Sequence, residues 1–225
     1  STPLPLSARI GVIGAGTMGA GIAQVAAAYG HQVLLFDQNP QAIERGLKQT
    51  ADGLDKQVTR GKLSPEQRQG ILDRMTGVTE IEALSDCQLI IEAIVEDLAI
   101  KQQLLTQLED CCSDTTILAS NTSSISITAL ASAMKHPQRL VGMHFFNPAP
   151  VMKLVEVVSG LATTRAIANR VHATASAWGK QAVHTRSTPG FIVNRVARPF
   201  YAEALRVLEE GGADIATVDT LMRSA

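Results

Sequence analysis

The fold is decided by the stretch RIGVIGAGTMG at residues 9–19. Residues 9–13 form a short apolar run rich in β-branched side chains, which predicts a buried strand. The chain then breaks into the glycine motif of residues 14–19, and an alanine-rich helix is expected over residues 20–29. A second apolar run at residues 31–36 ends on an acid. Strand, glycine turn, helix, strand and acid form the context that a dinucleotide-binding motif requires.

Each glycine of the motif has a physical task in such a unit. Gly14 allows the tight turn, Gly16 lets the backbone approach a pyrophosphate, and Gly19 lets helix and strand pack closely. Thr17 and Met18 complete the motif at the start of the helix, where free N–H groups and the positive dipole end bind phosphates. The alternative is a glycine-rich turn without a ligand, which the complete surrounding pattern disfavours.

The acid that ends the second strand, Asp37, indicates which cofactor binds. Its carboxylate is placed to accept hydrogen bonds from an adenosine ribose, and its charge would repel a 2′-phosphate. Gln38 and Asn39 follow it and offer no cation that would attract such a phosphate. The sequence therefore predicts NAD in preference to NADP.

The composition is that of an ordinary soluble globular protein. The chain has 225 residues, of which 45% are hydrophobic, and a formal net charge of −1. This balance argues against a nucleic-acid partner and against binding to an acidic membrane surface. No apolar run approaches the roughly 20 residues that span a bilayer, and residues 1–7 lack the pattern of a signal peptide.

The cysteines indicate a reducing compartment. Cys87, Cys111 and Cys112 are odd in number, lack CxxC spacing and include an adjacent pair that would form a strained disulfide. We therefore expect free thiols, no metal site and a cytoplasmic location.

A helical excursion is expected at residues 40–75, with a break near residues 61–65 where Ser64 begins a second helix. Lys56, Arg60 and Lys62 carry three cations near its tip. A solvated face is one explanation of these cations. The other is a phosphate-bearing ligand such as a coenzyme A nucleotide.

Further strands are expected at residues 77–79, 87–93 and 116–119, with a helix over residues 97–108. In an open parallel sheet, ligands meet the loops at the carboxyl ends of the strands. Glu96 and Lys101 therefore fall in the expected cofactor zone.

Five small polar residues, SNTSS at 120–124, follow the third of these strands. Ser124 or Ser126 suffices to cap the next helix, which is expected to run to Met134, so some of the other hydroxyls and the Asn121 amide are expected to be free to contact a ligand.

A proline-rich bend at residues 147–150 separates two apolar runs, residues 139–146 and 151–158, and is too short for a crossover helix. The two runs should pair antiparallel. His144 and Glu156 each lie six residues from Pro150, so the bend would place them opposite each other. Such a pair suggests a general base and its orienting partner. The alternative is a buried histidine that a carboxylate satisfies for structural reasons.

The expected fold class is α/β. It comprises a Rossmann-type, doubly wound, mostly parallel sheet with antiparallel last strands, plus the start of an all-helical C-terminal domain. Near residues 188–190 the sequence changes from strands that alternate with helices to a helical pattern. This divides the chain into an NAD-binding domain at residues 1–188 and a helical segment at residues 189–225. That segment is too small to bury its own core, so it needs a partner or a continuation.

Taken together, the motifs resemble the L-3-hydroxyacyl-CoA dehydrogenases. The resemblance is closest to the bacterial subgroup that acts on 3-hydroxybutyryl-CoA or, in phenylacetate catabolism, on 3-hydroxyadipyl-CoA. The residues that carry the resemblance are the glycine motif with Asp37, residues 94–96, residues 120–124, His144–Pro148 and Pro189–Arg195.

The resemblance implies oxidation of a (3S)-hydroxyacyl-CoA with NAD, with His144 as general acid and base and Glu156 holding its tautomer. It implies that Ser123 and Asn194 position the C3 oxygen of the substrate. By the same resemblance, the residues near the ribose and nicotinamide are Glu96, Lys101, Asn121 and Asn147.

The sequence departs from the family pattern in two respects. Gly53 and Arg60 stand where the family often has a serine and a lysine for the coenzyme A nucleotide, although Arg60 keeps the charge. The family also continues past residue 225 into helices that complete the substrate cover and a homodimer. We therefore expect this chain to bind the cofactor but to have weak or no activity unless those helices are supplied.

Two other functions remain open from the sequence. One is an NAD-dependent dehydrogenase of a free hydroxy acid or sugar acid. The other is a non-catalytic NAD-binding relative with a structural role, which would not need the set Ser123, His144, Glu156 and Asn194.

Overall fold

Eight strands form a single sheet in the computed structural model, which describes residues 1–224. Their order across the sheet is β3-β2-β1-β4-β5-β6-β7-β8. The strands are β1 (Ile10–Ile13), β2 (Val33–Phe36), β3 (Met75–Val78), β4 (Leu89–Glu92), β5 (Ile117–Ser120), β6 (Leu140–Phe145), β7 (Leu154–Ser159) and β8 (Gln181–Arg186).

The direction of the strands matches the predicted doubly wound sheet. Strands β1 to β6 run parallel to one another, whereas β7 pairs antiparallel with β6. Strand β8 runs parallel to β7, so the last two strands both oppose the other six. The expected Rossmann-type sheet with antiparallel last strands is confirmed.

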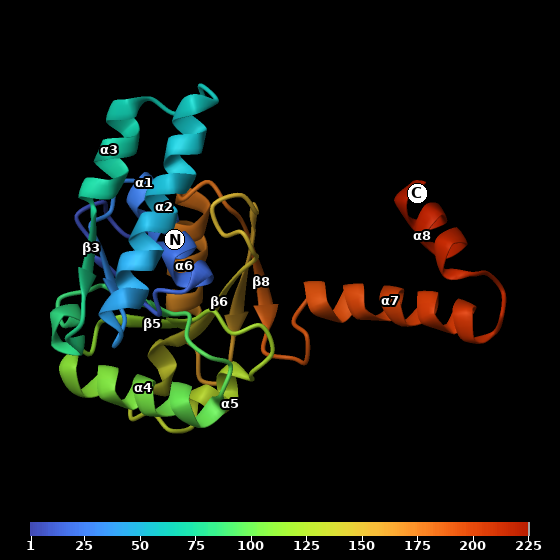
Figure 1. Cartoon of the computed structure of the whole chain (residues 1–225). Coiled ribbons are helices and arrows are strands. Elements are labelled where there is room, and N and C mark those ends of the chain that lie inside the picture. The colour runs from blue at the N-terminus through green and yellow to red at the C-terminus, as the bar shows by residue number, and fades with distance from the viewer. Residues whose placement is uncertain (225) are drawn as a thin grey trace.

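Helices cover both faces of the sheet (Figure 1). Alternate strand residues point to opposite faces. Ile10 and Val12 join the core beneath α1, α2 and α6, whereas Ile13 joins the core beneath α4 and α5. The helices are α1 (Thr17–Ala28), α2 (Pro40–Thr59), α3 (Pro65–Asp73), α4 (Leu98–Cys111), α5 (Ile127–Ala131), α6 (Arg165–Ala177), α7 (Val193–Glu209) and α8 (Ile215–Ser224), with 3-10 turns at Ile81–Leu84 and Pro137–Arg139.

Two helix boundaries differ from the sequence prediction. Helix α1 begins at Thr17, inside the glycine motif, because Gly16 is extended and its carbonyl accepts the first helical hydrogen bond from Ala20. Helix α5 ends at Ala131 instead of reaching Met134, and Ser126 is the residue that caps its start.

The excursion between β2 and β3 is a helical pair that projects from the sheet (Figure 1). Ser64 and Gln67 form a capping box at the start of α3, as the sequence predicts. Each side chain satisfies a backbone N–H that the helix itself leaves unpaired.

Helices α7 and α8 extend away from the sheet and bury none of their residues (Figure 1). Val196, Phe200, Tyr201 and Leu205 of α7 are all more than half exposed. This agrees with the expectation that the last segment cannot bury its own core.

Membrane spans and metal clusters are both missing from the described part of the chain. No helix within residues 1–224 is both long enough and apolar enough to cross a membrane. The same residues contain no group of three or more side chains that could together ligate a metal ion.

Candidate active site

The glycine motif has the geometry of a phosphate-binding turn. Gly14 has a φ of +97°, and a Cβ atom there would lie 2.6 Å from the Ala93 carbonyl oxygen. A Cβ atom on Gly19 would overlap the carbonyl oxygen of Gly14. A Cβ atom on Gly16, by contrast, would meet no protein atom within 4 Å. The backbone at Gly16 therefore faces open space, as close approach by a pyrophosphate requires.

The start of α1 is available to an anion. No side chain caps it, and no acid lies in its first turn. The first N–H groups of such a helix carry a positive partial charge and lack intrahelical partners. Gly16 and Thr17 line a surface hollow of about 430 Å³ together with Arg45 of α2 and with Lys48, which pairs with Asp52 of the same hollow. The open space, the free N–H donors and the Arg45 cation fit a dinucleotide phosphate.

Asp37 links the second strand to the glycine turn. Its carboxylate accepts hydrogen bonds from the backbone N–H of Ala15 and of Asn39, both at 2.9 Å. Asp37 and Gln38 also line a second pocket of about 430 Å³, whose walls include Ile94, Val95, Ile100 and Leu104. Gln103 and Gln107 also line it, and this mixture of polar groups and apolar walls suits a ribose that carries a flat heteroaromatic base.

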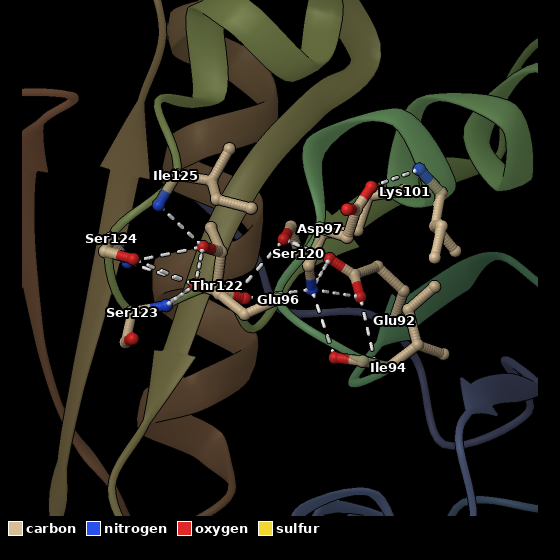
Figure 2. A network of polar contacts seen from close by, with 11 residues as sticks. Glu92, Ile94, Glu96, Asp97, Lys101, Ser120, Thr122, Ser123, Ser124 and Ile125 are labelled. Atoms are coloured by element: carbon tan, nitrogen blue, oxygen red, sulfur yellow. Dashed lines mark hydrogen bonds and ion pairs between the residues drawn. The ribbon is translucent and has the colours of Figure 1, made fainter.

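A buried ion-pair network lies at the carboxyl ends of β4 and β5 (Figure 2). The Lys101 ammonium lies 2.9 and 2.7 Å from the two carboxylate oxygens of Glu92 and 3.3 Å from Glu96. The side chains of Lys101 and Glu92 are each only 1% exposed. The hydroxyl of Ser120 also donates to Glu92.

Glu96 organises the loop after β5. One of its oxygens accepts hydrogen bonds from the Thr122 hydroxyl at 2.5 Å and from the N–H groups of Ser123 at 3.0 Å and Ser124 at 3.3 Å (Figure 2). Burial acts to raise the pKa of Glu96, but the Thr122 hydroxyl, the Lys101 charge and the backbone donors outweigh it and lower the pKa. Glu96 therefore holds this loop as an ionised acceptor.

These contacts engage two residues that were expected near the cofactor. The ammonium of Lys101 is not open to a cofactor, because it pairs with both Glu92 and Glu96. Lys101 therefore acts on the site by holding Glu96. The amide oxygen of Asn121 is not free either, since it accepts the N–H of Phe145 at 2.8 Å and so braces β6.

Among the hydroxyls of residues 120–124, some of which were expected to be free, all but one have partners. Ser120 donates to Glu92, and Thr122 and Ser124 donate to Glu96. Within residues 1–224, the hydroxyl of Ser123 alone among residues 120–124 forms no hydrogen bond with the protein, and Ser123 is exposed. The loop thus directs one serine hydroxyl toward solvent.

His144 and Glu156 lie directly opposite each other in the antiparallel β6–β7 pair, as predicted. Nδ1 of His144 lies 2.7 Å from a carboxylate oxygen of Glu156, with His144 5% exposed and Glu156 fully buried. Phe146 and Phe191 pack against the imidazole, with ring centroids 4.4 and 5.7 Å from it.

The second oxygen of Glu156 holds the start of α7. It accepts the backbone N–H of Ile192 and of Val193, each at 2.9 Å. Phe191, just before them, has a φ of +48°, a left-handed conformation that few residues other than glycine adopt. A carboxylate at a helix start is also favoured by the helix dipole. Glu156 therefore connects the histidine to the last helical segment.

A chain of contacts brings the remaining residues to the same place. The Nδ2 group of Asn194, one residue into α7, donates to the Ser123 carbonyl at 3.3 Å. Asn121 on the same loop bonds to Phe145, the residue after His144. Ser123, His144, Glu156 and Asn194 are therefore gathered around one site.

The other expected site residues take no part in this chain of contacts. Asn147 is exposed on the bend, and its side chain has no hydrogen-bonding partner within the described residues. Lys56 and Arg60 are exposed near the end of α2, where they form no ion pair with any residue from 1 to 224.

Sequence reasoning missed Glu92 and Lys180. Glu92 is an acid that ends an apolar strand nine residues before a lysine, which was a usable signal. Lys180 donates to the carbonyls of Ala149 at 2.6 Å and Met152 at 2.8 Å, so it holds the bend between β6 and β7. Burial lowers the pKa of Lys180.

Comparison with protein families agrees with this geometry. The family described as 3-hydroxyacyl-CoA dehydrogenase, NAD binding domain, matches residues 9–188, and its C-terminal domain matches residues 190–225. The chain belongs to the 3-hydroxyacyl-CoA dehydrogenase family. NAD is therefore the cofactor that the matched domain binds, and the open Gly16 cradle, the free start of α1 and the Asp37 pocket fit it.

Two members of the 3-hydroxyacyl-CoA dehydrogenase family illustrate the similarity in sequence. The chain is 53% identical to 3-hydroxyadipyl-CoA dehydrogenase of Escherichia coli strain K12, over 95% of this chain and 45% of that protein. It is 43% identical to a probable 3-hydroxybutyryl-CoA dehydrogenase of Bacillus subtilis strain 168, over 96% of this chain and 75% of that protein. The chain thus spans about half of one relative and three quarters of the other.

Solved structures of the 3-hydroxyacyl-CoA dehydrogenase family share the fold. 3-Hydroxybutyryl-CoA dehydrogenase from Escherichia coli K12 superposes with a TM-score of 0.91 at 53% identity, over 93% of this chain and 44% of that one. (S)-3-Hydroxybutyryl-CoA dehydrogenase from Ralstonia eutropha gives a TM-score of 0.91 at 39% identity, over 93% of this chain and 74% of that one.

Proposed function

We propose that this protein oxidises a (3S)-hydroxyacyl-CoA to the 3-ketoacyl-CoA with NAD. The observation that carries the proposal is the 2.7 Å contact between Nδ1 of His144 and Glu156, beside the exposed hydroxyl of Ser123. The names of the relatives support a short-chain or dicarboxylic substrate such as 3-hydroxybutyryl-CoA or 3-hydroxyadipyl-CoA.

His144 acts as the general base through Nε2. Nδ1 faces a carboxylate, which can only accept, so Nδ1 carries the ring proton and Nε2 is left with its lone pair. Nε2 takes the proton of the substrate hydroxyl, and the positive charge that then develops on the ring is stabilised by Glu156. NAD, when bound, supplies the hydride acceptor.

Ser123 and Asn194 orient the substrate. The free hydroxyl of Ser123 and the amide of Asn194 are the polar groups best suited to hold the C3 oxygen while His144 removes its proton. Holding reacting groups in place in this way contributes to rate by removing the entropy cost of their encounter.

The remaining residues bind the cofactor and the coenzyme A portion of the substrate. Ribose and nicotinamide contacts fall to Asp37, Gln38, Glu96, Asn121 and Asn147, with Lys101 acting through Glu96. The phosphates of NAD meet Gly14, Gly16, Thr17, Met18 and Gly19. Lys56 and Arg60 offer charge to the coenzyme A nucleotide.

We further propose that residues 1–188 are the cofactor domain and that residues 189–225 begin a helical substrate domain. The exposed apolar side chains of α7 support homodimerisation through that domain. A cytoplasmic location and a role in phenylacetate catabolism belong to the same proposal.

Replacing His144 tests the proposed function. His144→Gln should lower turnover of a 3-hydroxyacyl-CoA by roughly 10²- to 10⁴-fold, the usual contribution of a positioned acid–base group. NAD binding, followed by calorimetry, should stay nearly unchanged. A His144→Gln protein with wild-type turnover would refute the assignment. Turnover of the free hydroxy acid as fast as its thioester would refute the acyl-CoA substrate.

A further inference from the structure

A pocket beside the proposed active site is lined by positive charge that the proposed reaction does not use. It has a volume of about 610 Å³ and lies between the loop after β5 and one face of α7. Ser123 and Asn194 are among its lining residues, and so are Arg195, Arg198 and Arg206. The pocket therefore opens directly onto the groups that orient the substrate.

The arginines of this pocket differ in their partners. Arg206 pairs with Glu203 at 3.0 Å. The guanidinium groups of Arg195 and Arg198 form no hydrogen bond or ion pair with any residue between 1 and 224. No acid is among the described residues that line the pocket. Two cations thus face the pocket without a counter-charge.

Arg198 lies where the far end of a short acyl chain would reach. It follows Asn194 by four residues, so the two share one face of α7 and are separated by about 6 Å along the helix axis. In a six-carbon dicarboxylic chain, three carbon–carbon bonds of about 1.5 Å each separate C3 from the terminal carboxyl carbon. With C3 held at Asn194, that carboxylate falls within reach of the Arg198 side chain.

We infer that Arg198 binds the distal carboxylate of a dicarboxylic 3-hydroxyacyl-CoA and so selects it over the neutral acyl chain of the same length. The inference rests on the proposed function. A guanidinium is suited to the task because its planar donors match a carboxylate with two parallel hydrogen bonds. Arg195, next to Asn194, adds charge at the near side of the pocket.

The phosphates of coenzyme A are the other anions that could bind in this pocket. A matched pair of ligands distinguishes binding of a phosphate from binding of the distal carboxylate. 3-Hydroxyadipyl-CoA and 3-hydroxyhexanoyl-CoA have the same chain length and the same coenzyme A group, and differ in the terminal carboxylate. Calorimetry with the NADH-loaded chain measures the binding of each hydroxy thioester without turnover, because NADH cannot accept a hydride. The dicarboxylic thioester should bind more tightly.

Arg198→Gln should remove most of that preference. We expect binding of 3-hydroxyadipyl-CoA to weaken by roughly 10- to 100-fold, the range of a hydrogen bond to a charged group. Binding of 3-hydroxyhexanoyl-CoA should change less than about twofold. Arg198→Lys, which keeps the charge but not the paired donors, should retain part of the preference. Arg170→Gln on α6, outside the pocket, is the control with the same change in charge.

The outcomes separate the inference from the function on which it rests. Equal binding of both thioesters by the wild type, or equal weakening of both by Arg198→Gln, would overturn the carboxylate site while leaving the proposed function intact. An equal loss would assign Arg198 to the coenzyme A phosphates. If neither thioester binds while NADH still does, the proposed acyl-CoA function fails together with the inference.

Discussion

Glu156→Gln offers the sharpest test of how the site is held together. The carboxylate accepts three hydrogen bonds, from Nδ1 of His144 at 2.7 Å and from the N–H groups of Ile192 and Val193 at 2.9 Å. The amide that replaces it has one accepting oxygen and one donating NH₂ group. Glutamine therefore cannot satisfy the two sides of this site at once.

The amide oxygen should stay with the two backbone donors, because the opposite orientation would turn the NH₂ group toward them and lose both of their hydrogen bonds. The NH₂ group then faces Nδ1 of His144, which must become the acceptor, so the ring proton moves to Nε2. A histidine held in the wrong tautomer cannot take the substrate proton, and an equivalent change in a serine protease triad costs about 10⁴-fold. We expect a loss of similar order here.

The start of α7 should loosen as well. Hydrogen bonds to a charged group contribute about 1.5–3 kcal/mol and neutral ones about 0.5–1.5 kcal/mol. Each of the two backbone bonds should therefore weaken by about 1 kcal/mol, which corresponds to amide exchange at Ile192 and Val193 that is several-fold to about tenfold faster. Hydrogen exchange and the ¹⁵N shifts of the His144 ring measure both effects without requiring turnover.

Glu109→Gln is the matched control. Glu109 is also buried and also accepts two backbone N–H groups, those of Lys135 and His136, both at 2.8 Å. It lies near Arg139, away from the proposed site. Its replacement should weaken the fold locally and leave the His144 tautomer unchanged. If Glu156→Gln changed neither the tautomer nor the exchange rates, Glu156 would not be the group that aligns His144 and anchors α7.

Three further predictions use the cofactor turn, the acid network and the thiols. Gly16→Ala should keep the melting temperature but weaken NAD binding in calorimetry, whereas Gly19→Ala should lower both because its Cβ overlaps backbone. Glu96→Gln should destabilise the protein in denaturant titrations above pH 4.5. Because the pKa of Glu96 is lowered in the folded state, the difference from wild type should disappear as the pH falls below 4.5 and through that lowered pKa. Burial raises the pKa values of Cys87 and Cys112 to about 12, so a thiol reagent at neutral pH should modify Cys111, which is less buried, first in the native chain, and equal rates for all three would contradict this.

The parts of the fold that could be predicted are those that depend on local pattern. The glycine motif carries its conformational requirements in its own residues, so Gly14 and Gly19 could be assigned before their clashes were known. The opposition of His144 and Glu156 followed from the centre of one bend and the two-residue period of a strand. Both inferences needed only a short stretch of sequence.

The parts that could not be predicted depend on which partners the folded chain brings to each polar side chain. Lys101 is buried with its ammonium paired to Glu92 at the end of β4 and to Glu96 in the loop that follows, and helical composition alone does not reveal these pairs. The amide oxygen of Asn121 accepts a backbone N–H on β6. Almost every residue carries such a donor, so the sequence does not reveal which of them will pair with Asn121. The hydroxyl of Ser123 could therefore be recognised as the one in this run without a protein partner among residues 1–224 only when the partners of the others were known.

The position of the Glu156 acceptors has a consequence for how such proteins diverge. The acid lies within residues 9–188, the range of one family domain, and two of its donors lie within residues 190–225, the range of the other. Those donors are backbone groups, which any amino acid except proline supplies at positions 192 and 193. The hydrogen bonds to Glu156 therefore do not depend on the side chains at these two positions, and we expect them to persist when the C-terminal segment is exchanged with that of a relative, provided that the turn through Phe191 keeps its left-handed backbone. A graft that alters that turn should yield a folded, NAD-binding chimera whose histidine has lost its alignment.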